Sequence, residues 1–485
     1  MNGPGRPRLT AVLVDDPLLP WQRTVLEALE RSGLPVSISA TPSHRQPRSL
    51  AVRTYARLDR WPSSVERADG VTVVPADPDV VLDLTSARST AEAVTSTPTV
   101  FLHPRELDEE AILAELAAGR QVFRIEVRVK SVAGERCAVA STVALTRYSA
   151  RRSAERIRER AAALVVRALD RFDARDGWPD AEPAASPTVH RAASPAVARL
   201  VAGAVGAAAV LRLTRVDWRV AYGTVASDQP FAVPHDLRQV PAPPGRFYAD
   251  PFFARTADGT FLFVEDFDLA LGRAAISVID LSTGEARRAV TAQHHLSYPI
   301  VFEVDGTWYM LPEQAESGRV VLLRCEQLPD RWVDDTVLLD GVRAYDPTLF
   351  WDGDLWWLFC AMGTGSGSSD DELHVWYAAT LRGPFVPHPA NPVVSNVVGA
   401  RPAGRIVRDN GRLLRPAQDG SGEYGRAIVV NEILALSPTE YREQPVSTLT
   451  AHDLGAAGIH TIDVAGDLAV IDTKHRVLRS FGRRR

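Results

Sequence analysis

Two Asp-Pro pairs open similar apolar segments in the second half of the chain, and an acidic residue ends the segment between them. The pairs are "ADPFF", which contains Asp250, and "YDPTLF", which contains Asp346; the intervening "WYMLPE" ends on Glu313. Two carboxyl groups, one acting as acid and the other as base or nucleophile, are the minimum needed to cleave a glycosidic bond. Acid–base chemistry on a sugar is therefore the first hypothesis, provided that the fold brings these residues together.

The elements that would position them form an internal repeat. Five units each contain an apolar segment, a turn rich in Gly, Asp or Asn, and a second apolar segment; they cover residues 249–266, 298–314, 345–362, 401–419 and 460–475. Such turns are a strong signal of a β-hairpin. Units that recur about every 50 residues leave room for two more strands each. The repeat predicts an all-β five-bladed propeller over 215–485, with a sandwich of similar hairpins as the alternative.

Polar residues recur at two places in this repeat. The first set precedes the position that Pro occupies in four units: Asp250, Tyr298, Asp346, Arg401 and His460. The second set lies near the end of the second strand: Glu265, Asp266, Glu313, Gln418, Asp419 and Asp472. Polar side chains that converge on one concave axis indicate a binding site. The alternative for the acids is that they cap strand ends or pair with Arg405 and Arg415.

The first part of the chain has a different pattern. Apolar strand-like segments at 9–14, 35–39, 77–86, 97–103, 121–132 and 136–148 accompany helical spacing at 20–32 and 150–173. Strands that alternate with helices predict an α/β, Rossmann-like domain over 1–175. An Ala/Pro-rich linker and a helix would occupy 176–214. The predicted fold class is therefore multidomain, with an N-terminal α/β domain followed by the propeller.

The composition limits which classes of binding partner and which cellular compartment we expect. The net charge of −5 in 485 residues gives no electrostatic footprint for nucleic acid. Cys137, Cys325 and Cys360 are too dispersed for a disulfide framework or a metal site, so we expect a reducing, cytoplasmic location, no metal and no cofactor. No signal peptide is expected at the N-terminus. The Ala/Gly-rich segment 194–213 contains arginines and is predicted to be a packed helix with no membrane contact. The sequence does not indicate an oligomeric state.

"ADPFF" and "YDPTLF" resemble the inner-strand Asp motifs of the five-bladed glycoside hydrolases of the arabinanase and β-xylosidase type. The resemblance implies that Asp250 is the general base and that Asp346 tunes the acid and orients substrate. The acid position of that family falls on Arg401, which cannot donate a proton at neutral pH. Glu313 or Glu265 would have to replace the acid.

A closer resemblance covers about 215–485. "FYADPFF", "HLSYP", "WYMLPE", "ARPAGRI" and "RPAQD" followed by "YGRAI" resemble the N-terminal propeller domain of plant glucosamine inositolphosphorylceramide transferase. This resemblance implies a carbohydrate-linked role without defining a reaction, and bacterial chains carry the same propeller. The candidate substrate-binding residues are Arg401, His460, Tyr298, Glu265, Asp266, Asp419 and His295. His460 could also hold a water or an ion at the propeller axis.

The first domain is similar, more weakly, to the formyltransferase N-terminal fold that often precedes this propeller in bacteria. That family needs an Asn, a His and an Asp around a Ser-Leu-Leu-Pro loop. The segment "FLHPREL" offers His103 without such a loop. The resemblance therefore implies a degenerate domain.

Three functions stay open. In the first, the propeller is glycosidase-like or transfers glycosyl groups, and Arg401 holds an anionic group of the sugar or glycoconjugate. In the second, it is a non-catalytic glycan- or glycolipid-binding module with stacking aromatic residues; the candidates are Trp308, Tyr309, Trp356 and Trp357. In the third, the first domain transfers a formyl or acyl group and the propeller is a platform for the substrate.

Overall fold

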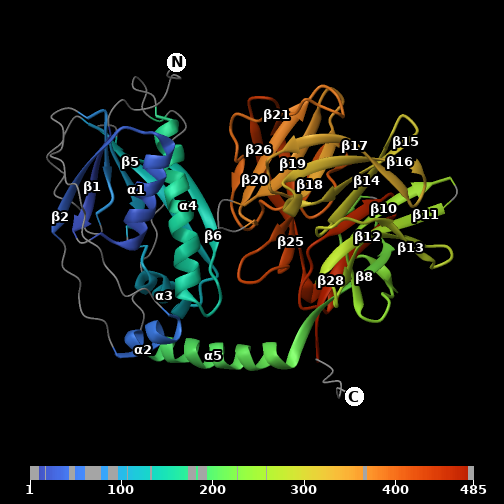
Figure 1. Cartoon of the computed structure of the whole chain (residues 1–485), viewed down its shortest axis with the longest axis horizontal. Helices are drawn as coiled ribbons and strands as arrows, with labels where there is room; N and C mark the ends of the chain where they lie inside the picture. The colour runs from blue at the N-terminus through green and yellow to red at the C-terminus, as the bar shows by residue number, and fades with distance from the viewer. Residues whose placement is uncertain are drawn as a thin grey trace. The chain divides into compact units, whose positions relative to one another are not determined.

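The computed structural model divides the chain into two compact units, with the boundary at Ala208 and Ala209 inside helix α5 (Ser194–Leu213) (Figure 1). The structure describes residues 10–16, 18–42, 50–60, 78–85, 97–105, 107–131, 134–172, 178, 182–183, 194–226, 228–257, 259–363 and 369–478. Most of the predicted linker 176–195 lies outside these residues. Within them, no helix is long and apolar enough to cross a membrane.

The first unit contains one seven-stranded sheet with the order β2-β1-β3-β4-β5-β6-β7. The strands are β1 (Thr10–Asp16), β2 (Val36–Pro42), β3 (Val80–Asp83), β4 (Thr99–His103), β5 (Val122–Ser131), β6 (Gly134–Ala144) and β7 (Glu182–Pro183). The first four are parallel, and β5, β6 and β7 add antiparallel pairings. The helices are α1 (Pro20–Ser32), α2 (Leu50–Leu58), α3 (Glu109–Ala117) and α4 (Ala150–Asp170).

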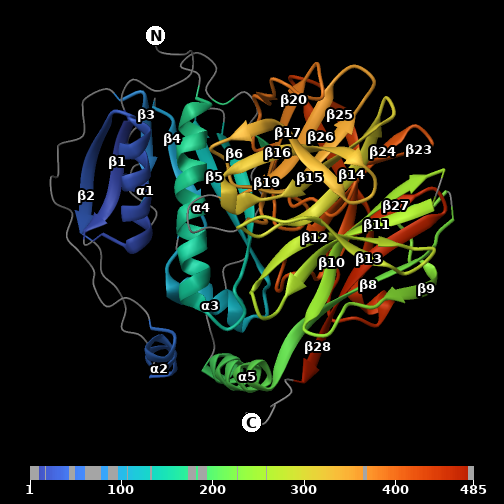
Figure 2. The same cartoon turned by 45° about the vertical axis from the view of Figure 1, so that its right-hand side comes forward.

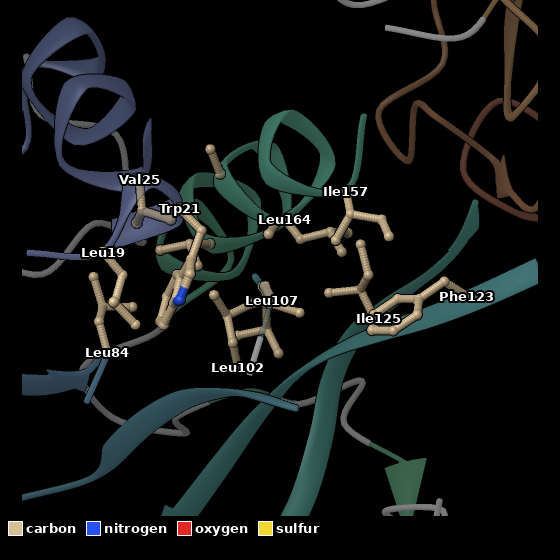
Figure 3. Close-up of a cluster of buried hydrophobic side chains, with 14 of the residues drawn as sticks. Leu19, Trp21, Val25, Leu84, Leu102, Leu107, Phe123, Ile125, Ile157 and Leu164 are labelled. Carbon is tan, nitrogen blue, oxygen red and sulfur yellow. The ribbon is translucent and has the colours of Figure 1, made fainter. Parts of the chain in front are cut away.

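Helix α1 shows how apolar spacing builds this unit. Trp21, Val25 and Leu29 lie on one face and are buried, and Gly33 ends the helix in the left-handed conformation at φ 70°. Figure 3 shows the side chains of α1 and α4 meeting those of the sheet in one core. Strands β1–β6 and helices α1 and α4 lie at the predicted positions, whereas α2 and α3 were not predicted. The likeness to formyltransferases stays a prediction.

The second unit confirms the five-bladed propeller, because within the described residues it contains five antiparallel sheets built on the repeat. Blade 1 contains β10 (Arg246–Thr256), β11 (Gly259–Asp268), β12 (Arg273–Asp280) and β13 (Ala286–Val290). Blade 2 contains β14 (Ser297–Val304), β15 (Thr307–Glu313), β16 (Arg319–Gln327) and β17 (Arg331–Asp340). Blade 3 contains β18 (Ala344–Trp351), β19 (Trp356–Met362), β20 (Glu372–Ala378) and β21 (Val386–Pro387), with β22 (Val394–Ser395) also on β20. Blade 4 contains β23 (Val407–Asp409), β24 (Arg412–Asp419), β25 (Ala427–Leu436) and β26 (Tyr441–Thr450).

Blade 5 is assembled from both ends of the propeller sequence. Its inner strands are β27 (Ile462–Ala465) and β28 (Leu468–Leu478), and its outer strands are β8 (Thr214–Thr224) and β9 (His235–Val240). Figure 2 shows β8 beside β28. In this way β8 covers the edge of β28 that would otherwise be free to pair with another chain. The repeat did not predict this pairing, because β8 and β9 precede the first repeat unit.

An ion pair strengthens the closure. The guanidinium of Arg405, from the segment before β23, contacts the buried carboxylate of Asp463 on β27. The same carboxylate accepts the backbone N–H of Phe253 on β10 at 2.8 Å. Blades 4, 5 and 1 are therefore joined at one buried acid.

Candidate functional site

In three blades, the residue before the recurrent proline lies at a β-bulge. Asp250, Tyr298 and Asp346 have positive φ values of 47°, 46° and 50°, and in each case the strand register shifts at that point. A non-Gly residue in this conformation is strained, and such strain gathers at functional sites. Bulges re-aim side chains near active sites. In blades 1, 2 and 3 the repeat therefore supplies more than a strand start, because a bulge redirects the side chain before the proline.

Asp250 lies at the junction of blades 1 and 5. Its Oδ1 accepts a hydrogen bond of 2.6 Å from the Thr461 hydroxyl and lies 3.1 Å from His460 Nε2. Burial alone would raise the pKa of this carboxyl, but the charge and hydrogen bond of His460, helped by Thr461, lower it to about 2. Asp250 is therefore a buried carboxylate at neutral pH.

Asp472, on β28, organises this junction. It accepts the backbone N–H groups of Asp250 at 3.0 Å, His460 at 3.1 Å and Thr461 at 3.0 Å. Its Oδ2 also lies 2.6 Å from His460 Nδ1. Burial disfavours a charged imidazole, but Asp472 and Asp250 outweigh it and raise the pKa of His460 well above its usual value. His460 is thus a buried cation between two carboxylates.

Glu265, on β11, completes the first carboxyl pair. It forms a hydrogen bond with Asp250, and His295 Nε2 lies 3.5 Å from its Oε1. Burial and the charge of Asp250 raise the pKa of Glu265 well above its usual range. Because one member has a raised pKa and the other a lowered one, Glu265 carries the proton of this pair.

A second carboxyl pair joins blades 2 and 3. Glu313, at the end of β15, accepts the backbone N–H of Asp346 at 3.1 Å. Burial and the charge of Asp346 raise the pKa of Glu313 well above its usual range, although Arg401 opposes the shift. Asp346 also accepts hydrogen bonds from Arg401, at 2.7 and 3.2 Å, and from Gln418 at 2.8 Å.

Arg401 stands between this pair and the outer part of the site. Its Nη1 donates to Asp370 Oδ1 at 2.8 Å and to the Ser369 hydroxyl at 3.3 Å. The rings of Tyr345 and Tyr424 lie 5.6 and 5.5 Å from the guanidinium carbon, within cation–π range. Arg401 Nη2 also lies 3.7 Å from Glu313 Oε2. The residue at the predicted acid position therefore contacts three carboxyl groups and two aromatic rings.

The remaining candidates lie elsewhere. Tyr298 is wholly buried, and its hydroxyl contacts Thr348 Oγ1 at 3.0 Å and accepts the N–H of Gly404 at 2.7 Å, so it packs across blades 2, 3 and 4. Asp266 points away from Glu265, because neighbouring residues of a strand face opposite sides.

Asp266 accepts from Ser277 and pairs with Arg246 and Arg288 within blade 1. Asp419 accepts the N–H of Ser421 in the turn after β24. The contacts given above join Asp250, Glu265, His460 and His295 in one cluster and Glu313, Asp346 and Arg401 in a second. Asp266 and Asp419 make local contacts instead.

Three further residues contact the site without having been predicted. The ring of Trp218 on β8 lies against that of His460, tilted by 41° with centroids 4.1 Å apart, and Tyr424 lies 5.3 Å from the same imidazole. Asp370 reaches Arg401 from the segment before β20. The repeat could not reveal Tyr424 and Asp370, because both stand outside its strand positions.

The aromatic residues predicted to stack on sugars differ in how deeply they are buried. Trp357 is fully buried and donates to Asp352 at 2.6 Å, so its ring belongs to the core. Trp356 is partly buried between Phe302 and Trp351.

Asp250, His460 and Asp472 place one ligand atom each within 4.8 Å of one another, which is the geometry of a metal site among the described residues. His460 is protonated here, because both of its ring nitrogens face carboxylates. A metal ion binds the neutral imidazole and releases its proton, so this cluster could hold either a protonated His460 or a divalent cation.

Residues 227–457 match the family model described as "Glucosamine inositolphosphorylceramide transferase 1, N-terminal". The propeller resembles that region. The transferase of Oryza sativa subsp. japonica is 35% identical over 212 residues, which cover 42% of this chain and 28% of the rice protein. The transferase of Arabidopsis thaliana is 34% identical over 211 residues, with the same coverage of 42% and 28%. The chain thus spans less than a third of these relatives, and the match confirms the predicted resemblance of the propeller.

Solved structures show weaker similarity. The family 117 glycoside hydrolase Zg3597 of Zobellia galactanivorans has a TM-score of 0.36 and 11% identity, over 54% of this chain and 90% of that one. The GH62 α-L-arabinofuranosidase domain of Coprinopsis cinerea has a TM-score of 0.37 and 12% identity, over 53% and 97%. The propeller assignment rests on the sheet topology, not on these similarities.

Proposed function

We propose that the propeller is a carbohydrate-active domain that hydrolyses or transfers a glycosyl group of a sugar or glycoconjugate. The observation that carries this proposal is the contrast between the carboxyl groups of the site. Against the effect of burial, His460 and Thr461 lower the pKa of Asp250 to about 2, whereas burial beside other carboxyl groups raises the pKa values of Glu265 and Glu313 well above their usual range. Environments that push the pKa values of neighbouring carboxyl groups apart assign the acid and the base.

Glu313 is the better acid of the two candidates. Glu265 is hydrogen-bonded to Asp250, whereas the carboxyl groups of glycosidases stand about 5–5.5 Å apart in retaining enzymes and about 6.5–9.5 Å apart in inverting ones. No sugar oxygen or water fits between two groups in direct contact. In the proposed reaction, Glu313 protonates the leaving oxygen while Asp250 activates the acceptor, and Glu265 holds Asp250 in place.

The relatives' name supports the substrate class. It describes a transferase for glucosamine and inositolphosphorylceramide, a sugar and a phosphorylated glycolipid precursor. We propose, by this likeness, a glycoconjugate substrate for the present chain. The reaction is separate from any activity of the N-terminal unit, for which formyl transfer is the remaining prediction, and the free cysteines are in keeping with the proposed cytoplasmic location.

The experiment is a turnover screen with matched variants. The purified chain is incubated with neutral and anionic glycans and glycoconjugates, and released or transferred sugars are identified by mass spectrometry. Glu313→Gln and Asp250→Asn should each lower turnover by about 10²–10⁴-fold, the usual contribution of general acid–base catalysis. The control is Asp340→Asn, at an exposed ion pair on blade 2. Turnover by Glu313→Gln at the rate of the unmodified chain would remove Glu313 as the acid.

A second candidate function rests on the pairing of Asp346. Both of its oxygens accept from Arg401, and one also accepts from Gln418, so the residue predicted to orient substrate is already occupied. This favours a non-catalytic glycan- or glycolipid-binding module. The screen decides between the two, because saturable glycan binding without turnover of any substrate supports the module and contradicts the enzyme.

A further inference from the structure

The guanidinium of Arg401 has two edges with different partners. The inner edge, Nε and Nη2, donates to Asp346, whose side chain is 2% exposed. The outer nitrogen, Nη1, donates to Asp370, whose side chain is 26% exposed. The inner pair is therefore fixed in the protein interior, whereas the outer pair reaches solvent.

The two carboxylates are also anchored differently. Asp346 is held by the bulge of β18 and by Gln418, so it cannot leave Arg401 without a rearrangement of the blade. Asp370 lies on the connection between β19 and β20, two residues before β20 begins. Its side chain is 26% exposed, and its Oδ1 also accepts a hydrogen bond of 3.0 Å from the Ser369 hydroxyl. Because Asp370 is the most exposed carboxylate partner of Arg401, another anion can reach the same nitrogen while the inner pair stays intact.

Two tyrosines restrict what can approach Nη1. The rings of Tyr345 and Tyr424 lie near the guanidinium, and Tyr424 also borders His460. Aromatic rings offer sugars an apolar surface, and Nη1 of the fixed guanidinium offers an oxyanion a charge-assisted hydrogen bond. A sugar that carries an anionic oxygen matches both surfaces.

The local charges limit the ligand to one negative charge. His460 and Arg401 are cations, and the carboxylates paired with them are Asp250, Asp472, Asp346 and Asp370. Anions therefore already outnumber cations here. A singly charged ligand that replaces Asp370 leaves this balance unchanged, whereas a doubly charged ligand adds repulsion in a buried region where charges interact strongly.

We infer that Asp370 occupies an anion subsite, and that the ligand's singly charged oxyanion, a phosphodiester or a sugar carboxylate, displaces Asp370 from Arg401. The inference rests on the proposed carbohydrate site and names the class of its substrate. Asp370 then acts as an internal competitor, since it keeps Arg401 paired until an anionic sugar arrives.

Calorimetric binding to four probes tests the subsite. Glucose 1-(methyl phosphate) and glucuronic acid each carry one charge, glucose 1-phosphate carries mostly two, and glucose carries none. The unmodified chain should bind the two monoanions more tightly than glucose 1-phosphate or glucose. Which monoanion binds more tightly distinguishes a phosphodiester source from a uronic acid source.

Asp370→Asn should raise the affinity for both monoanions about tenfold, because the ligand no longer displaces a charge-assisted hydrogen bond. Arg401→Gln should abolish the preference for monoanions over glucose. Arg401→Lys should retain part of this preference, which would show that the loss in Arg401→Gln does not come from a folding defect. The matched control Asp340→Asn removes an exposed acid from an arginine on blade 2 and should change nothing. Equal affinities in Asp370→Asn and the unmodified chain would overturn the inference.

The outcome is separable from that of the turnover screen. Tighter monoanion binding by Asp370→Asn without any turnover would sustain the subsite and contradict the catalytic proposal. Turnover of neutral glycans, with no effect of Asp370→Asn on any probe, would sustain catalysis and contradict the subsite.

Discussion

His460 Nε2 lies 3.1 Å from Asp250 Oδ1, so blades 5 and 1 meet through a buried ion pair. On the other side of the ring, His460 Nδ1 lies 2.6 Å from Asp472 Oδ2. The ion pair lies on the seam where the last inner strands of the chain meet the first blade. The contacts that join the last blade to the first are therefore the same contacts that lower the pKa of Asp250, the proposed base.

The activity of the proposed enzyme should depend on pH through Asp250 and Glu313. Asp250, with a pKa of about 2, is ionised throughout the ordinary range, so no acid limb is expected above about pH 3. Glu313 keeps its proton until the pH passes its raised pKa, and kcat/KM should then fall about tenfold per pH unit. Initial rates across pH 3–10 measure this profile. An acid limb near pH 4–5, typical of an unperturbed carboxylate, would contradict the role of Asp250.

Asp472→Asn should destabilise the propeller by about 3–5 kcal/mol, because it leaves the buried His460 cation with one carboxylate partner fewer. Urea unfolding of the propeller, followed by tryptophan fluorescence, measures the loss. The control is Asp467→Asn, which removes a surface partner of Arg255 and should cost less than about 1 kcal/mol. Similar losses of unfolding free energy in the two variants would show that the buried ion pair stabilises the propeller no more than the exposed one does.

The stability of the propeller should change with pH on both sides of a plateau. The pKa of His460 is raised on folding, so its contribution is fully present below about pH 6.5 and is lost as the pH rises through the folded value. The pKa of Asp250 is lowered, so its contribution is present above about pH 4 and is lost as the pH falls toward 2.

Melting temperatures of the unmodified chain and of His460→Gln across pH 3–10 test this assignment. The variant should be less stable on the plateau and should lack the alkaline decline that His460 produces. An identical alkaline decline in both proteins would assign that decline to other groups.

A chain that begins at residue 244 should fail to form a closed propeller, because it lacks β8 and β9, two of the four strands of blade 5. A chain that begins at residue 209 retains both strands and is the control. Circular dichroism and urea unfolding compare the two. A cooperative transition of equal midpoint in the shorter chain would show that β8 and β9 do not stabilise the ring.

Local pattern was enough to predict the blades, because every blade repeats the same strand, turn and proline position. The same pattern identified Asp250, Asp346, Arg401 and His460 as one set, and the structure links them in two buried clusters. It did not separate Glu265 from Asp266, since only the register of β10 and β11 decides which of two neighbours faces inward.

Sequence by itself determined the α/β and propeller halves of the chain, the repeat and the residues that start its inner strands, because these features depend on neighbours along the chain. Tertiary structure alone decided that β8 completes blade 5, that the pKa values of Glu265 and Glu313 are raised by burial and neighbouring carboxyl groups, and that Asp370 pairs with Arg401. Each of these depends on burial and on contacts between different strands or blades, and a side chain acquires such surroundings only when the blades pack together.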